Sequence, residues 1–131
     1  ALLHNNSHKF VCKNVILSTQ TTNTLVTNKL ADGENILIPI AHGEGRYHAD
    51  AETLKILNDN DQVLFRYCDE SGNITDESNP NGSIENIAAI CNEGRNVFGM
   101  MPHPERAADE ELSNTDGRGI FESILAAVVP A

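Results

Sequence analysis

The stretch Met101-Pro102-His103-Pro104-Glu105-Arg106 contains the residue types best suited to proton transfer. Prolines on both sides of His103 restrict the backbone, and a carboxylate follows two residues after the imidazole. In an extended chain, residues two apart point to the same side, so Glu105 can accept the imidazole N–H. Such a pair fixes the tautomer of a general base. The alternative is a rigid surface turn with an incidental histidine.

A second candidate is the loop His42-Gly43-Glu44-Gly45-Arg46, which follows an apolar segment. Its glycines allow a ligand to approach the backbone closely, and loops at strand ends are common ligand positions. The alternative is a glycine-rich turn with solvated charges. A metal site built on His42, Glu44, His48 and His103 matches no zinc spacing, so we expect no metal.

The three cysteines, Cys12, Cys68 and Cys91, all fall within or at the end of predicted strands. None lies in a sharp strand-to-helix turn, where a nucleophilic thiol is exposed, so we expect structural roles for them. An odd number without a CxxC pair argues against a disulfide framework and favours a cytoplasmic location. The sequence therefore offers a base and its orienting acid without an evident nucleophile.

Composition limits the function classes further. The chain has 131 residues, 40% of them hydrophobic, and a formal net charge of -10. This length suits one domain, residues 1–131. The acidity argues against nucleic acid as a partner, and the lack of a polybasic run argues against a membrane surface. The apolar runs are shorter than the roughly 20 residues of a membrane helix, and no signal-peptide pattern opens the chain.

The elements that must position these residues are mostly strands. Pattern and propensity predict strands over 10–17, 24–30, 36–41, 62–67, 84–91 and 97–101. Pro39 requires an edge strand or a bulge. A helix is predicted over 50–57 with Asp50 as its N-cap, and a last amphipathic helix over 120–129. On that helix, one face is expected to carry Phe121, Ile124, Leu125 and Val128. An antiparallel-rich sheet with a C-terminal helix follows.

Several blocks resemble class I (triad) glutamine amidotransferases and, within them, the glutaminases of phosphoribosylformylglycinamidine synthase, a purine-biosynthesis ligase. The resemblance covers essentially the whole chain. The blocks that carry it are Lys9-Phe10, Pro39–Arg46, Asn79–Ser83, Asn86–Ala88, Val97–Ala107 and Asp116-Gly117.

The resemblance implies a Cys-His-Glu triad in which His103 is the catalytic histidine and Glu105 orients it. The family's nucleophile sits in a Gly-x-Cys-x-Gly elbow that this sequence lacks. We therefore expect the C-terminal portion of a longer, flavodoxin-like α/β domain with a mixed, strand-rich sheet, inactive by itself. The resemblance assigns His42, Gly43, Glu44 and Arg46 to the glutamine pocket or to a subunit contact, and leaves that choice open.

The resemblance also implies partners. Glutamine is hydrolysed through a thioester, and the ammonia passes to a synthetase subunit or domain that holds ATP and magnesium, with a small accessory subunit as an open addition. No cofactor is expected in this part. Because the sheet would lack neighbouring strands, we expect the isolated chain to associate with itself. The competing hypotheses are a non-catalytic binding module of the synthetase complex and, more remotely, a metal hydrolase.

Overall fold

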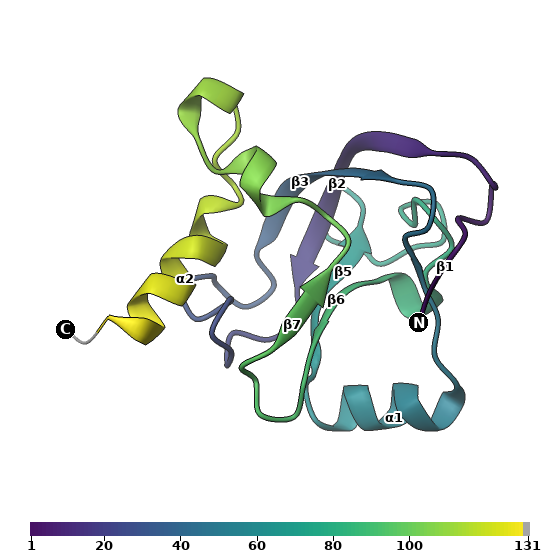
Figure 1. Cartoon of the computed structure of the whole chain (residues 1–131), viewed down its shortest axis with the longest axis horizontal. Helices are drawn as coiled ribbons and strands as arrows, with labels where there is room; N and C mark the ends of the chain where they lie inside the picture. Colours follow the sequence, from purple (N-terminus) through teal and green to yellow (C-terminus); the bar gives the residue numbers. More distant parts are fainter. Residues whose placement is uncertain (130–131) are drawn as a thin grey trace.

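The computed structural model describes residues 1–129 and centres on a five-stranded sheet of order β3-β2-β5-β6-β7 (Figure 1). Every pairing between neighbouring strands of this sheet is antiparallel. A short separate ribbon pairs β1 with β4. The bounds of the strands are β1 Leu2–Leu3, β2 Val11–Thr19, β3 Asn35–His42, β4 Arg46–Tyr47, β5 Val63–Cys68, β6 Ile87–Cys91 and β7 Phe98–Met100. The strand-rich sheet expected from the sequence is confirmed.

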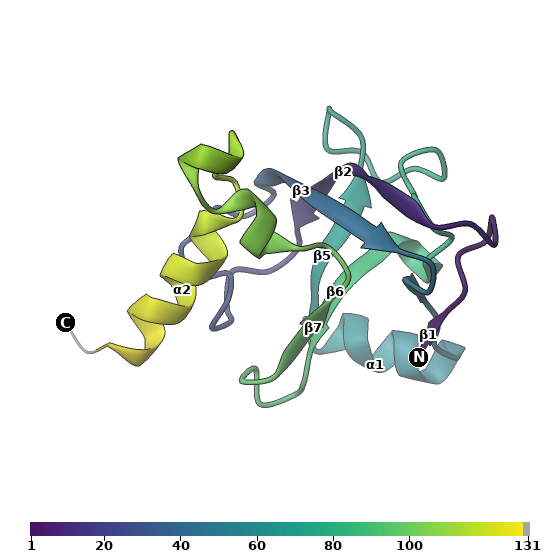
Figure 2. The same cartoon turned by 45° about the horizontal axis from the view of Figure 1, so that its top comes forward.

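Two α-helices, α1 (Ala51–Asp59) and α2 (Arg118–Val128), lie at different sides of the sheet (Figures 1 and 2). Asp50 caps α1 as predicted, because its Oδ1 accepts the Thr53 backbone N–H at 2.8 Å. Three short 3₁₀ helices complete the elements: Ile84–Asn86, Pro104–Ala107 and Glu110–Leu112. None of the helices within residues 1–129 is long and apolar enough to span a membrane.

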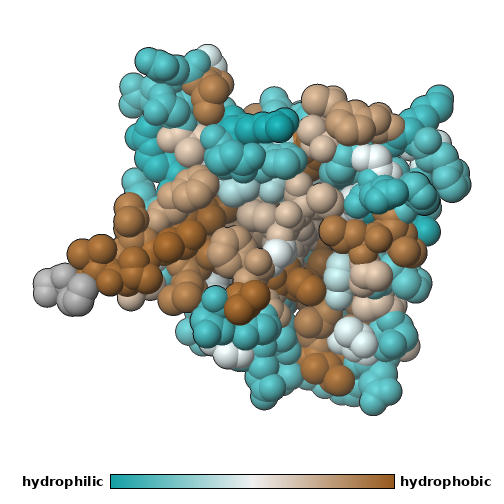
Figure 3. Space-filling view, in the orientation of Figure 1, coloured by the Kyte–Doolittle hydropathy of each residue, from teal (hydrophilic) through white to brown (hydrophobic). Residues whose placement is uncertain are grey.

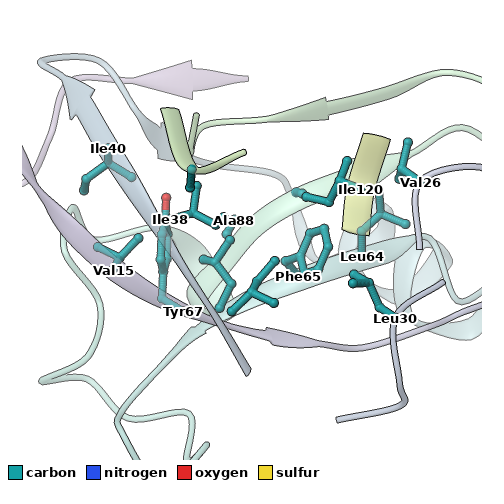
Figure 4. Close-up of a cluster of buried hydrophobic side chains, with 14 of the residues drawn as sticks. Val15, Val26, Leu30, Ile38, Ile40, Leu64, Phe65, Tyr67, Ala88 and Ile120 are labelled. Atoms are coloured by element: carbon teal, nitrogen blue, oxygen red, sulfur yellow. The ribbon is translucent and has the colours of Figure 1, made fainter. Parts of the chain in front are cut away.

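The main core forms where side chains of the sheet pack against the 24–30 segment and α2 (Figure 4). β5 and β6 supply fully or nearly fully buried side chains, in keeping with their central positions. Ile120 of α2 packs into the same cluster as Phe65 and Leu30. The largest buried side chains include Tyr67, Phe65, Leu17, Ile38, Ile40 and Leu64.

Strand β3 is an edge strand, as Pro39 required. Its free edge is sealed by side chains from the segment before α2. Asp116 Oδ2 accepts the Leu37 N–H at 2.8 Å, and Asn114 Nδ2 donates to the Leu37 carbonyl at 2.7 Å. Capping the backbone in this way blocks further strand pairing and ties the C-terminal segment to β3.

The strand predicted over 24–30 is wrong: this segment is a run of turns. Hydroxyl and amide side chains compete with a strand ladder here, since Thr24 and Thr27 hydroxyls lie 2.6 Å apart and Asn28 Nδ2 donates to the Thr24 carbonyl at 3.2 Å. Its apolar residues still fill the core, because Val26 and Leu30 are buried.

The apolar residues expected on one face of the last helix do not form its buried face. Phe121, Leu125 and Val128 are exposed, and Ile124 is only partly buried. The buried face is formed by Ile120 and Ser123, because small residues allow α2 to approach the 28–30 segment. Ser123 Oγ accepts the Lys29 N–H at 3.0 Å, and a Cβ at Gly119 would meet Leu30 Cδ2 at 2.6 Å. Ile120 and the polar contacts of Ser123, not the strongest apolar stripe, therefore attach this helix to the core.

Candidate active site

His103 and Glu105 form the pair that the sequence suggested. His103 Nδ1 and Glu105 Oε1 lie 2.9 Å apart. The reason differs from the predicted one, because the pair does not lie on an extended strand. His103 is the N-cap residue of the 3₁₀ helix Pro104–Ala107, and Glu105 lies in the first turn of that helix. A helix start, rather than strand alternation, brings the two side chains together.

The backbone of His103 is fixed from β3. Its N–H donates to the Pro39 carbonyl at 2.8 Å, and its own carbonyl accepts the Arg106 N–H at 3.1 Å. The Arg106 guanidinium is 3.8 Å from Glu105 Oε1, within the distance of an ion pair. Both side chains are more than half exposed, so this ion pair contributes little to stability.

The hydrogen bond to Glu105 determines which ring nitrogen of His103 is free. An ionised carboxylate only accepts hydrogen bonds, so His103 Nδ1 donates to Glu105. Nε2 is then the basic nitrogen, available to a reacting group. The His103 side chain is 30% exposed, which leaves it reachable from solvent while its ring is held. This arrangement can accept a proton and return it.

The loop residues proposed from the sequence gather around segment 4–6 rather than around Glu105. Gly43 accepts the Asn5 N–H at 2.9 Å, and Glu44 lies 3.3 Å from His4 Nδ1. Arg46 Nε donates to the His4 carbonyl at 3.1 Å. These contacts tie the loop to segment 4–6. The alternative of a turn with solvated charges therefore fits the Glu44 side chain only in part, because Glu44 also lies near His4.

His42 differs from its loop neighbours because it is buried, with 6% of its surface exposed. Its Nδ1 lies 3.0 Å from Asn5 Oδ1, and its Nε2 lies 3.3 Å from Asn81 Nδ2. Burial lowers the pKa of His42 below its ordinary value, and a charge on His103 lowers it further. Sequence reasoning missed Asn5, and it used the Asn79–Ser83 loop only as one of the blocks that carry the family resemblance.

An apolar pocket of about 270 Å³ lies between the glycine loop and the segment that leads to His103. It is lined by β6 and β7 residues, by Gly45 of the loop and by Met101, two residues before His103. Ala1 and Leu2 also line this pocket. Gly45 is the residue of the His42–Arg46 loop that reaches this pocket.

Cys68 and Cys91 have the properties of buried structural thiols, whereas the buried role expected for Cys12 is wrong. Burial raises the pKa of Cys68 to about 11 and also raises the pKa of Cys91. Cys12 is exposed on β2, where it pairs across the ladder with Ala41. Among residues 1–129, no group of three or more His, Cys, Asp or Glu side chains is placed to hold a metal ion.

The buried, neutral state of His42 predicts a pH dependence of stability. Its pKa is lowered in the fold from 6.5, so the unfolded chain binds the proton more tightly. The free energy of unfolding should therefore fall as pH drops below 6.5. The groups facing the ring are the uncharged Asn5 and Asn81, the Tyr67 hydroxyl beyond Asn81, and the His103 imidazole.

Urea unfolding at several pH values checks this prediction, with His42→Gln as the matched variant. The loss between pH 6.5 and about pH 5 should be smaller in the variant. The lowered carboxyl pKa values of Asp50 and Asp69 act in a lower window, below 3.8, and do not interfere. Parallel curves for the two proteins would contradict the prediction.

Comparison with known proteins gives the relatives of the chain. Residues 1–120 match the model of the CobB/CobQ-like glutamine amidotransferase domain. The chain is 54% identical over 128 residues to phosphoribosylformylglycinamidine synthase subunit PurQ of Koribacter versatilis, covering 98% of this chain and 55% of that protein. It is 54% identical over 125 residues to the same-named subunit of Acaryochloris marina, covering 95% and 53%.

A solved structure, that of PurLQS from Thermotoga maritima, contains a chain that aligns with a TM-score of 0.80 and 43% identity. The alignment covers 98% of this chain and 53% of that one. The chain thus spans about half the length of the curated relatives it matches. With the family model matching most of its residues, the chain belongs to the CobB/CobQ-like glutamine amidotransferase domain family.

Proposed function

We propose that this chain is part of a glutaminase that supplies ammonia to phosphoribosylformylglycinamidine synthase in purine biosynthesis. The observation that carries the proposal is the 2.9 Å contact between His103 Nδ1 and Glu105 Oε1 in a chain of the amidotransferase family. Its substrate would be glutamine and its products glutamate and ammonia.

In this proposal, His103 handles the protons of a two-step acyl transfer. His103 Nε2 takes the proton of a cysteine thiol, and the resulting thiolate attacks the side-chain amide carbon of glutamine. The C–N bond breaks as Nε2 delivers this proton to the departing ammonia, which leaves a thioester. His103 then accepts a proton from water, which attacks the thioester and releases glutamate. Glu105 stabilises the imidazolium that forms in between.

We place the nucleophile outside these 131 residues. The raised pKa values of Cys68 and Cys91 keep both thiols protonated. The curated relatives are about twice as long, which leaves room for a further cysteine. We therefore propose that residues 1–131 are the C-terminal portion of one amidotransferase domain, and that the isolated chain does not hydrolyse glutamine.

The proposed partner is a synthetase subunit or domain, which would bind ATP and magnesium, with a small accessory subunit as a further member. The names of the relatives and the PurLQS structure support this assignment. The free thiols, the two buried ones included, support a reducing, cytoplasmic location.

The experiment is glutamate formation from glutamine by the complete protein that carries this chain, alone and with the synthetase. We expect hydrolysis that depends on His103 and rises when the synthetase is present. A complete protein that binds the synthetase without hydrolysing glutamine would replace this function with that of a binding module.

We also propose that the isolated chain associates with itself along the open side of the sheet. Apolar side chains are exposed on α2 and at the edge strand β7, among them Leu125 and Val128, and Val97 and Phe98 (Figure 3). Patches of this kind on isolated proteins promote association. Sedimentation of the 131-residue chain should show dimers or larger species, and a monomer at all concentrations would contradict this.

A further inference from the structure

A buried hydrogen-bond network lies beside the proposed catalytic pair, and the proposed reaction does not use it. At its centre, the imidazole of His42 bonds with both ring nitrogens, Nδ1 to Asn5 Oδ1 at 3.0 Å and Nε2 to Asn81 Nδ2 at 3.3 Å. All three side chains are buried, with exposed fractions of 6% for His42, 0% for Asn5 and 2% for Asn81.

The orientation of each amide is fixed independently of the histidine. Asn81 Oδ1 accepts the Ser83 N–H at 3.0 Å, so the Asn81 NH₂ must face His42. Asn5 Nδ2 donates to the Lys9 carbonyl at 2.9 Å and to the His42 carbonyl at 2.8 Å, so Asn5 Oδ1 must face the ring. His42 Nε2 therefore accepts and Nδ1 donates, which defines a neutral imidazole with its proton on Nδ1.

The same two amides hold the glycine loop through its backbone. Asn5 Oδ1 also accepts the Gly45 N–H at 3.1 Å, and Asn81 Nδ2 donates to the Gly45 carbonyl at 2.9 Å. The ring of His42 packs so closely on Gly45 that a Cβ there would collide with it. At Gly43, by contrast, a Cβ would have no atom within 4 Å apart from those of its chain neighbours.

Two connections link this network to His103. Gly45 and Met101 line the same apolar pocket, and Met101 is two residues before His103. His42 also ends strand β3, whose Pro39 carbonyl accepts the His103 N–H at 2.8 Å. The network therefore supports both a wall of the pocket and the strand that carries the proposed base.

We propose that His42 is a positioning residue of the amidotransferase site, held by Asn5 and Asn81 as a neutral Nδ1–H imidazole that fixes Gly45 at the rim of the pocket beside His103. This inference rests on the proposed function and deepens it. Because a second proton on His42 would face the Asn81 NH₂, His103 is the imidazole of this region that is free to exchange protons.

The first test measures the tautomer by ¹⁵N-histidine NMR of the 131-residue chain. We expect a protonated Nδ1 and an unprotonated Nε2 for His42, and this neutral form should persist as the pH falls through 6.5. Gly45→Ala should abolish this signature, and the matched Gly43→Ala should retain it. A His42 ring that takes up a second proton at or above pH 6.5, or that carries its single proton on Nε2, overturns the proposal.

The second test measures glutamine hydrolysis by the complete protein. His42→Ala should lower kcat/KM about tenfold or more, since small displacements at a reacting centre are costly. His42→Gln, which keeps a donor and an acceptor, should recover most of this loss, and His8→Asn should have no effect. If His42 had only a structural role, the activity of each variant would follow its folded fraction. His42→Ala and His42→Gln would then be equally active per folded molecule.

The outcomes separate this inference from the proposed function. A complete protein that hydrolyses glutamine equally well with His42→Ala overturns the positioning role alone. A complete protein that hydrolyses no glutamine overturns the proposed function and the positioning role with it, whatever the tautomer of His42.

Discussion

The His103→Gln variant of the complete protein is expected to lose glutamine hydrolysis by a factor of about 10² to 10⁴, the usual contribution of a general acid–base group. The side chain introduced at position 103 is similar to histidine in polarity, but it cannot take up a proton near neutral pH. The measurement is glutamate release at saturating and at low glutamine, so that kcat and KM are obtained separately. The larger change should be in kcat.

The size of this effect follows from how the ring is held. Glu105 accepts from Nδ1 at 2.9 Å, the Pro39 carbonyl holds the backbone N–H at 2.8 Å, and Nε2 is left as the free nitrogen. A base oriented in advance loses little freedom in the transition state. Glu105→Ala should therefore also lower kcat, but less than His103→Gln, because the ring can still transfer protons and loses its orientation and the stabilisation of its imidazolium.

A matched control is His8→Asn. His8 is an exposed histidine with a φ of 52°, a conformation that asparagine tolerates well. We expect this variant to hydrolyse glutamine at the rate of the unmodified protein. If His103→Gln were as active as His8→Asn, the histidine would be incidental to a rigid turn, the alternative that the sequence left open.

The His103–Glu105 pair was predictable because it depends on residues two apart and on prolines that limit the backbone. Local spacing is enough when both partners belong to one short segment. The same holds for the Asp50 cap of α1, and for the edge position of β3, which Pro39 requires. Even so, the local geometry was wrong, since a 3₁₀ helix and not a strand forms the pair.

The network around His42 was not predictable in this way. Asn5 and Asn81 reach the histidine across 37 and 39 residues of sequence. Asparagine is also common in turns, so its presence in two polar segments carries little information. Only the fold shows that both amides are buried and that each has its orientation set by backbone groups.

The buried face of α2 could not be predicted for a similar reason. Periodicity located the helix but not the face that packs, because the strongest apolar stripe of Phe121, Leu125 and Val128 is exposed. Burial was decided by the small residues Gly119 and Ser123, which permit close approach and hydrogen bonds to the 28–30 segment. Apolar patterning cannot distinguish a core face from an interface when a helix carries both.

The Gly117→Ala variant is expected to have the largest effect on folding that a single methyl group can produce in this region. Gly117 precedes α2, and its N–H donates to the Ala107 carbonyl at 2.7 Å. A Cβ at this position would meet the Pro104 carbonyl oxygen at 2.5 Å and the Ala107 carbonyl oxygen at 3.0 Å. Both are backbone atoms, so no side-chain rotation can relieve the clash.

The start of α2 and the 3₁₀ helix Pro104–Ala107 must then separate. We expect the free energy of unfolding to fall by about 3 kcal/mol, at the upper end of the usual cost of overpacking. Denaturant unfolding measures this, with Gly99→Ala as the stability control, because a Cβ at Gly99 would have no atom within 4 Å apart from those of its chain neighbours. Equal losses in the two variants would contradict the argument from close approach.

The same displacement should reach the proposed site, because the helix that moves carries Glu105 and begins at His103. In the complete protein, the fraction of Gly117→Ala that remains folded should hydrolyse glutamine more slowly, by up to about 10²-fold for a shift near 1 Å. Activity per folded molecule equal to that of the unmodified protein would mean that the pair holds its geometry without α2. The junction between Ala107 and Gly117 would then matter for stability alone, and β3, through the Pro39 carbonyl, would be sufficient to position the base.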